Sequence, residues 1–407
     1  MNTKALGIRD NGKIRSRRYG ILILYVLAIL FSTYPFVFNL ILPLPSITIL
    51  MIVNLAVYVL LTASGSVRTL KDLIPICIAQ MVATVLSLLA TSDTEYFKQL
   101  LYIFSGLTLV SIVKTVGLRR FLFCYNRIIL VVAVLGTLSS ILTILFGERI
   151  LMEYVNMDGR PGWFVYFTFT NTINGGIIRY SGIFDEPGAM ALWGMFSLVF
   201  NKIYVKDKMI EIPLIICLLF TFSIAFIIQV AMYLVFFYVF EAKFHTKLIV
   251  ILLTILAVGF VFFNIDKDSP IYMLTFGRLG IGTSYNILED SSRANLMLIA
   301  KQTFEAHPWL GVGSTAFYGG TYMADNPYET LAKDGIIGTI FLYLPLICTF
   351  YIGLRKKEVL FSSLLLSVGY LQRPFHINFL HYTMLYLFFF VALQIYKEET
   401  RQRLCVK

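Results

Sequence analysis

Long apolar stretches recur along almost the whole chain, and they constrain its fold more than any other feature. A helix that crosses a bilayer needs about 20 apolar residues, and the first stretch, Tyr19–Leu42, exceeds that length. Apolar residues make up 58% of the 407 residues and charged residues 14%, against about 45–50% and about 25% in soluble domains. The sequence therefore predicts an all-α polytopic membrane protein, and excludes a soluble enzyme or a nucleic-acid-binding module.

The apolar stretches divide into twelve predicted membrane spans. One stretch, 210–241, is long for a single crossing and short for two. Lysines precede and follow it, at Lys208 and Lys243, so both flanks look cytoplasmic. A tight hairpin near Ser223 therefore fits better than one crossing. The twelve spans are about 19–42, 46–63, 73–91, 98–113, 127–146, 188–205, 210–223, 226–241, 248–264, 336–354, 359–372 and 377–396.

The placement of positive charge sets the orientation. Lys and Arg are concentrated in connections on the side of the N-terminus, which predicts that both termini are cytoplasmic. Residues 1–18 then form a basic cytoplasmic tail, 19–396 a single transmembrane domain and 397–407 a second tail. Two outer connections are long, about 147–187 and about 265–335. Chemistry on the outer face is expected in these two loops, because long loops in compact proteins are usually functional.

The first outer loop ends with Arg179 and the acidic pair Asp185-Glu186. The acids stand where a helix N-terminus favours negative charge, and Pro187 suits a first helical turn. Helix capping therefore competes with a chemical role for Glu186. Arg179 has no such explanation, because an outer arginine opposes the positive-inside bias. A guanidinium group can bind a diphosphate through two parallel hydrogen bonds.

The second outer loop contains a predicted helix from about Ser291 to Glu305. Arg293 lies in its first turn, where a cation opposes the helix dipole, so its placement hints at another role. A segment with two glycines, Gly311 and Gly313, follows. These glycines indicate a tight turn with close backbone approach, which explains them better than a phosphate-binding loop does.

A second helix start lies further along this loop. Asn326 as the cap, Pro327 at the first position and Glu329 at the third form a start that resembles a capping box. Asp325 precedes the cap and has no structural explanation of this kind. Asp334 and the following glycine are expected to break the chain before the span that begins at 336.

Other polar residues of the outer face have competing explanations. Arg373, at the last outer corner, either snorkels to lipid headgroups or contacts a substrate. His307 and His381 are best explained as structural histidines with satisfied hydrogen bonds. Asp266 and Asp268 have the spacing of a metal-binding pair but flank a lysine, so a solvated loop explains them better. No metal ion or other cofactor is predicted.

Taken in order, these motifs resemble those of the O-antigen polymerase (Wzy) and O-antigen ligase superfamily of bacterial membrane glycosyltransferases. The order and the topology match over about residues 15–400. The matching pieces are Arg179-Tyr-Ser-Gly182 with Glu186-Pro187, Thr221-Phe-Ser223 in the short hairpin, Arg293 leading to His307-Pro-Trp-Leu-Gly311-Val-Gly313, and Asp325-Asn326 leading to Asp334-Gly335-Ile-Ile-Gly338.

The resemblance implies a GT-C-like fold and glycan transfer on the outer face of the bacterial inner membrane. The donor would be a glycan on undecaprenyl diphosphate, with no metal ion. A polymerase transfers the chain to the next lipid-linked repeat unit, and a ligase transfers it to the lipid A core. Arg179 and Arg293 would clamp the diphosphate, and Asp325 or Glu186 would act as the base. Residues that would bind substrate are Arg373, Asn326, His307 and Arg278.

One departure favours the polymerase over the ligase. In ligases a histidine typically precedes the asparagine, whereas this chain has Asp325-Asn326. The expected product is an O antigen, a capsule or an exopolysaccharide. Expected partners are lipid-linked oligosaccharides, the bilayer and a chain-length regulator. A flippase or other transporter is the alternative from another class, but transporters usually carry ionisable residues within spans and internal repeats. Nearly all charges here lie in loops.

Overall fold

The computed structural model covers most of the predicted transmembrane domain. The predicted site residues Arg278, Asp325 and Arg373 lie outside the described residues, as does the predicted span at 248–264. Arg293 is described in its backbone only. The described residues are 4–32, 47–155, 161–174, 176–240, 266, 269, 272, 291–319, 326–372 and 379–405.

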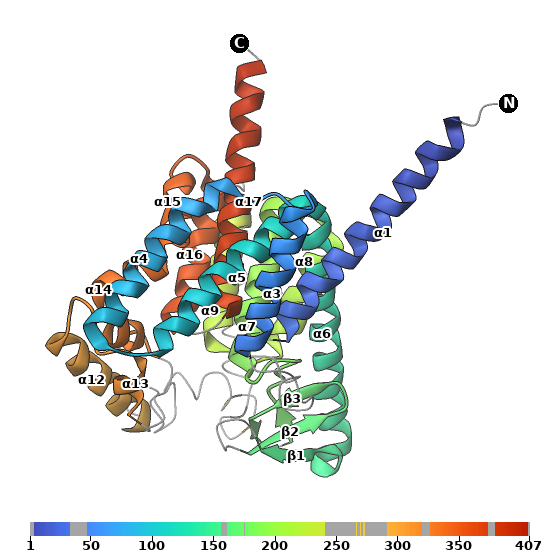
Figure 1. Ribbon diagram of the computed structural model, residues 1–407. Coiled ribbons are helices and arrows are strands. Elements are labelled where there is room, and N and C mark those ends of the chain that lie inside the picture. Colours follow the sequence, from blue (N-terminus) through green and yellow to red (C-terminus); the bar gives the residue numbers. More distant parts are fainter. Residues whose placement is uncertain are drawn as a thin grey trace.

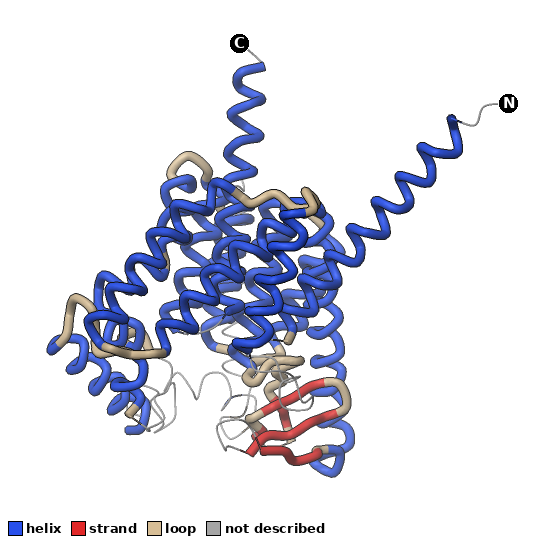
Figure 2. Tube along the Cα trace, viewed as in Figure 1, coloured by secondary structure: helices blue, strands red, loops and turns tan. Residues whose placement is uncertain are grey.

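Helices form most of the described structure (Figures 1 and 2). Two of them, α7 and α9, continue into π-helical turns, η3 (Asn201–Val205) and η4 (Val235–Val239). The helices are α1 (Lys4–Phe31), α3 (Ile47–Ala63), α4 (Ile74–Thr91), α5 (Glu95–Val116), α6 (Leu118–Phe146), α7 (Pro187–Phe200), α8 (Lys208–Leu219), α9 (Ile224–Leu234), α12 (Ser291–Ala306), α13 (Ser314–Tyr318), α14 (Glu329–Leu342), α15 (Leu344–Gly353), α16 (Lys357–Gln372) and α17 (Phe379–Cys405).

Five described helical segments are long and apolar enough to cross a membrane. A sixth is added if α14 and α15, which meet at 42°, count as one bent span. Some predicted spans correspond to shorter apolar helices, such as α3. Apolar side chains are exposed along one face of α4, at Ile78, Val82, Leu86 and Leu89, as contact with lipid requires. These features are those of a polytopic membrane protein.

The two ends of the bundle contain different parts of the chain. Both chain termini lie at one end, and α12, α13 and the strands lie at the other (Figure 1). Those elements come from the two loops that the sequence places on the outer side. The described elements of the two long loops therefore lie at the same end of the molecule.

The stretch 210–241 forms a helical hairpin, which confirms the prediction of a tight turn near Ser223. The chain turns at 220–223, between α8 and α9, where Phe222 has a φ of 47°. The far end of α9 returns to the start of α8, because the hydroxyl of Tyr233 donates to Glu211 Oε1 at 2.6 Å. Lys202 lies 3.4 Å from the same oxygen.

The first outer loop contains β-strands, which the all-α prediction missed. Strands β1 (Met152–Val155), β2 (Pro161–Val165) and β3 (Thr168–Thr170) form an antiparallel sheet in that order. Trp163 pairs with Thr170 across β2 and β3. Strands β4 (Ile173–Asn174) and β5 (Ile177–Ile178) form a second, short hairpin. The run from Trp163 to Thr170 is rich in aromatic and β-branched residues, which favour strands.

Helices α7 and α17 lie at the centre of the bundle. Nearly every side chain of α7 is buried, and α17 packs against α5, α7 and α15. A helix that is apolar and buried on all sides belongs to the interior of a bundle. The first outer loop leads into α7 and contacts the α8–α9 turn through Arg179 and Thr221.

Candidate functional site

Arg179 follows β5 and lies against the turn of the α8–α9 hairpin. Its Nε donates to the carbonyl of Thr221 at 3.2 Å. Its backbone N–H donates to the carbonyl of Thr172 at 3.2 Å, and its carbonyl accepts from Thr170 Oγ1 at 2.8 Å. The side chain is half-buried. Two pieces of the sequence pattern, around Arg179 and Thr221, thus meet in space, and we call this pair the arginine site.

The residues after Arg179 have structural roles. Tyr180 is fully buried, and its hydroxyl donates to the carbonyl of Cys217 at 2.9 Å. Gly182 has a φ of 65°, and a Cβ there would lie 2.5 Å from Val132 Cγ1. Only glycine fits that conformation and that space. Tyr180 and Gly182 therefore place the loop on the bundle, and Arg179 is left as the candidate for chemistry.

Glu186 occupies the N-cap position of α7, with extended backbone angles. Its carbonyl accepts from the N–H of Ala189 at 3.0 Å, but its carboxylate makes no capping hydrogen bond to this helix. Side-chain capping, the competing explanation in the sequence, therefore does not account for the acid at this position. The side chain is half-buried.

The second outer loop packs on the bend of α14 through main-chain contacts. The N–H of Gly313 donates to the carbonyl of Lys333 at 2.9 Å, and that of Ile336 to the carbonyl of Pro308 at 2.8 Å. Gly335 has a φ of 64°, and a Cβ there would lie 2.3 Å from the carbonyl carbon of Trp309. A Cβ on Gly311 would lie 2.1 Å from the carbonyl oxygen of Lys333.

This backbone interlock explains the two glycines of the Gly311-Val-Gly313 segment. The N–H groups of Gly311, Val312 and Gly313 all donate to carbonyls of the chain, so they are not available to bind a phosphate. The expectation of a close-approach turn is confirmed. The break predicted after Asp334 is also confirmed, because Gly335 has non-helical backbone angles within α14.

Asp93, in the short connection between α4 and α5, fixes the start of α13. Its Oδ2 accepts from the N–H of Thr315 at 2.8 Å, and its Oδ1 accepts from Thr315 Oγ1 at 2.7 Å and from the N–H of Glu95 at 3.0 Å. Burial raises the pKa of Asp93, but these hydrogen bonds to the charged form outweigh burial, so its pKa lies below the usual value. Asp93 lies in a short connection, outside the two long loops in which the sequence predicts the site residues.

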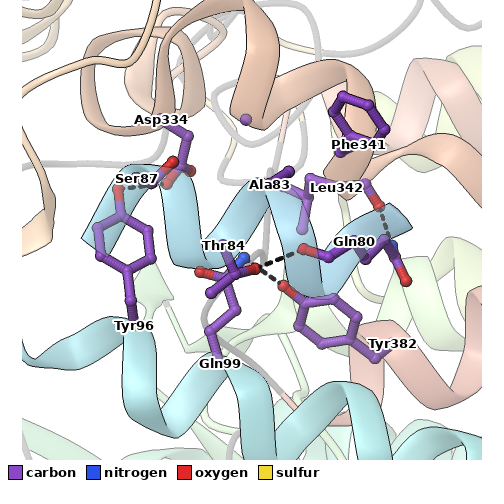
Figure 3. A pocket seen from close by; sticks show the side chains of 11 residues that line it. Gln80, Ala83, Thr84, Ser87, Tyr96, Gln99, Asp334, Phe341, Leu342 and Tyr382 are labelled. Carbon is purple, nitrogen blue, oxygen red and sulfur yellow. Dashed lines mark hydrogen bonds between the residues drawn. The ribbon is translucent and has the colours of Figure 1, made fainter. Parts of the chain in front are cut away.

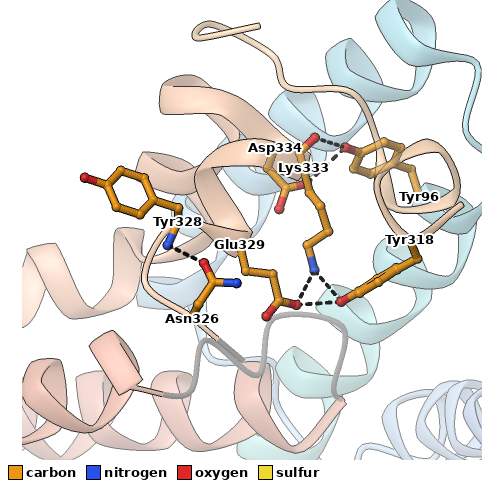
Figure 4. Close-up of polar contacts among 7 residues, drawn as sticks. All are labelled: Tyr96, Tyr318, Asn326, Tyr328, Glu329, Lys333 and Asp334. Carbon is orange, nitrogen blue, oxygen red and sulfur yellow. Dashed lines mark hydrogen bonds and ion pairs between the residues drawn. The ribbon is translucent and has the colours of Figure 1, made fainter. Parts of the chain in front are cut away.

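Glu329 and Lys333 form a buried ion pair one helical turn apart (Figure 4). Lys333 Nζ lies 3.0 Å from Glu329 Oε1, and the Lys333 side chain is 0% exposed. The hydroxyl of Tyr318 donates to the same oxygen at 2.5 Å and also accepts from Lys333 Nζ at 3.0 Å. We call Tyr318, Glu329 and Lys333 the lysine cluster.

The lysine cluster corrects the prediction of a capping box. Glu329 does not reach back to the start of its helix, because it pairs with Lys333. The helix begins at Glu329, two residues later than predicted. Asn326 does act locally, since its Oδ1 accepts from the N–H of Tyr328 at 3.0 Å. The spacing of Glu329 and Lys333 is that of a helical ion pair, so the sequence contained a signal for this contact.

Asp334 lies on the other side of α14 and lines a small polar cavity (Figure 3). Its Oδ1 accepts from the hydroxyl of Tyr96 at 2.9 Å, and its buried Oδ2 has no hydrogen-bond partner among the described residues. The cavity measures about 10 Å³, which is room for roughly one water molecule. Other polar side chains that line it are those of Gln80, Thr84, Ser87, Gln99 and Tyr382.

His381 differs from its prediction. It is fully buried at the start of α17, as a structural histidine would be. However, neither of its ring nitrogens has a hydrogen-bond partner within the described parts of the chain. The rings of Tyr343, Tyr370 and Tyr382 surround it, with centroids 5.5, 4.9 and 5.4 Å away. The expectation of a satisfied histidine is therefore wrong.

The remaining predicted residues divide between the two loops. Arg293 lies in the first turn of α12, as predicted, and His307 is exposed just after the end of that helix. Asn326 is buried beside the lysine cluster. The convergence of Arg179 with Arg293 stays a prediction. The described residues contain no group of three or more His, Cys, Asp or Glu side chains placed to hold a metal ion.

Comparison with known proteins adds no relative: no family model matches the chain, and neither does any curated protein sequence.

Proposed function

We propose that this protein is a polysaccharide repeat-unit polymerase of the bacterial inner membrane. It transfers a growing glycan from undecaprenyl diphosphate to the next lipid-linked repeat unit on the outer face. The proposal includes twelve spans in a GT-C-like arrangement and cytoplasmic termini. The product is an O antigen, a capsule or an exopolysaccharide, and a chain-length regulator is an expected partner.

The observation that carries the proposal is the contact of Arg179 with the α8–α9 turn. Residues 42 positions apart, both part of the sequence pattern that suggests this superfamily, are joined by a hydrogen bond at the end of the bundle opposite the termini. A second pair of pattern pieces, Gly311-Val-Gly313 and Asp334-Gly335, is joined by the backbone interlock. Both contacts support the view that the pattern describes one folded unit.

The proposed chemistry needs positive charge where the leaving group forms. The bond between the sugar and the diphosphate breaks, so negative charge grows on the diphosphate in the transition state. Fixed cations that are aimed at this charge lower the barrier. Arg179 is held through its Nε, which orients the guanidinium plane, and Arg293 would provide the second cation. On this proposal the two arginines do the work that a metal ion does in other transferases.

The test is the envelope glycan of a deletion strain, resolved on a gel. A polymerase defect leaves single repeat units and removes long chains. Long chains that stay on the lipid carrier would indicate a ligase instead, and repeat units trapped on the cytoplasmic side would indicate a flippase. Either of these two results contradicts the proposal.

Complementation with variants then tests the arginine site. Arg179→Ala should abolish long chains without lowering the amount of protein in the membrane. Arg179→Lys should also fail, because a lysine offers a point charge rather than a planar fork. Arg149→Ala is the matched control, since Arg149 is an exposed arginine of the same outer loop. Glycan chains of normal length with Arg179→Ala would contradict the proposed role of Arg179 in binding the diphosphate.

A further inference from the structure

The carboxylate of Glu329 is held in an asymmetric way. Its Oε1 accepts from both Lys333 Nζ and the hydroxyl of Tyr318. Its Oε2 is buried and has no hydrogen-bond partner among the described residues. Figure 4 shows this second oxygen turned away from Lys333 and Tyr318, on the side of Asn326. A buried acceptor without a donor costs about 1–3 kcal/mol, so such an oxygen needs an explanation.

Neighbouring carboxylates do not present an oxygen in this way. Both oxygens of Asp93 accept hydrogen bonds from Thr315. Asp334 has an oxygen without a partner among the described residues, but this residue lines a small cavity with room for roughly one water molecule. Glu329 differs from both, because it lies in the first turn of α14, at the outer end of the bent span and next to Asn326.

We propose that Glu329 is the general base of the glycan transfer, and that the hydrogen-bond donor missing at Oε2 is the acceptor sugar hydroxyl. This inference rests on the proposed function. In the step, the O–H bond of the acceptor breaks and its proton goes to Glu329 Oε2. The acceptor oxygen forms a bond to the anomeric carbon, and the bond from that carbon to the diphosphate breaks, with its electron pair leaving on the diphosphate.

Lys333 and Tyr318 are positioning residues in this arrangement. They hold Oε1 of the Glu329 carboxylate in place, so the orientation of Oε2 is also fixed. A base must lie within hydrogen-bond reach of the proton that it removes, and geometry decides this before pKa does. The assignment replaces Asp325 and Glu186, the two acids that the resemblance suggests for this role.

A purely structural explanation competes with the proposal: Glu329 is present only to neutralise the buried Lys333. The single variant Glu329→Gln cannot separate the two, because it leaves the charge of Lys333 buried and unpaired, which destabilises the fold. The double variant Glu329→Gln/Lys333→Met removes both charges at similar volume. Its stability should therefore return toward that of the unmodified protein, whichever explanation holds.

The decisive measurement is the rate of the double variant with purified lipid-linked repeat units. If Glu329 is the base, the rate stays about 10²–10⁴-fold below the unmodified protein, although thermal unfolding shows a folded protein. Recovery of the rate to within a few-fold would overturn the proposal and leave Glu329 as a partner of Lys333.

The same preparation separates this inference from the proposed function. Arg179→Ala measured beside the double variant reports on the polymerase reaction itself. An unmodified protein that extends no lipid-linked repeat units contradicts the proposed function and the inference together. An active protein that loses its rate with Arg179→Ala but keeps it with the double variant contradicts the inference alone.

Discussion

The arginine site and the lysine cluster bury their cations to different degrees. In the arginine site, the half-buried guanidinium of Arg179 contacts a neutral carbonyl at 3.2 Å, so the contact with Thr221 does not cancel its charge. In the lysine cluster, the fully buried Lys333 is neutralised by Glu329 at 3.0 Å. On the proposed function, an anion approaches the half-buried Arg179. The lysine cluster suits a neutral ligand that donates a hydrogen bond, because Oε2 of Glu329 has no donor among the described residues.

This difference suggests a division between the two substrates. A lipid diphosphate is the anion that the arginine site would bind, and a sugar hydroxyl is the donor that the lysine cluster lacks. Both sites belong to the end of the bundle opposite the chain termini, one beside the first long loop and one within the second. The first of three predictions tests whether the two regions differ as described, and the other two test the contacts that attach the second loop to the bundle.

The largest contrast is expected when each cation is replaced by methionine. Lys333→Met leaves the carboxylate of Glu329 buried without its cation, which should cost about 3–5 kcal/mol of stability. Arg179→Met removes a half-buried side chain whose contact with Thr221 is to a carbonyl, and should cost about 1–2 kcal/mol. Thermal unfolding of the purified proteins, followed by tryptophan fluorescence, measures both. Equal losses would show that the two cations are not held differently.

A smaller loss is expected at the bend of α14. In Gly335→Ala the new methyl group would meet the main chain of Trp309, at a φ of 64° that alanine rarely adopts. Overpacking of this kind costs about 1–3 kcal/mol. Gly319→Ala is the control, since a Cβ there would have its nearest contact at 3.6 Å although the φ is also positive. Similar unfolding temperatures in the two variants would contradict the interlock.

The smallest effect is a dependence on pH at Asp93. Hydrogen bonds from Thr315 and Glu95 lower the pKa of this carboxyl in the folded protein. Its contribution to stability is therefore complete above the pKa in the unfolded chain, about 3.9, and is lost as the pH falls through the lower folded pKa. Protection of the α13 amides, taken relative to the intrinsic exchange rate at each pH, should fall over that acidic range. In Asp93→Asn this protection should be low at every pH, and a variant that keeps the protection of the unmodified protein would exclude this anchor.

The helical part of the fold could be predicted from sequence because it depends on local signals. Apolar length identified the spans, and the lysines around 210–241 predicted the hairpin that the contact of Tyr233 with Glu211 now confirms. The glycine after Asp334 predicted the bend. Each of these features depends on a few residues that are neighbours in the sequence, because their side chains determine the local backbone conformation.

Contacts between distant segments could not be predicted in this way. Asp93 and Thr315 are 222 residues apart, and nothing local marks them as partners. For Glu329 two local patterns competed, a capping box with Asn326 and an ion pair with Lys333. Burial decided between them, because a lysine without contact to water needs its counter-ion more than a helix start needs a cap. Burial is a property of the tertiary structure, so the sequence alone favoured the wrong partner.

The interlock between the second outer loop and α14 also determines what a systematic alanine scan of this region can detect. The contacts that hold Pro308 and Trp309 to Ile336 and Ile337 use only main-chain atoms, so truncating those side chains leaves the hydrogen bonds in place. A scan would report a tolerant segment there. The same scan would find large losses of stability at Gly311 and Gly335, because alanine adds a side-chain atom there instead of removing one. If this loop tolerates alanine substitutions, the reason would therefore be that main-chain atoms attach it to α14. It would not mean that the loop is dispensable.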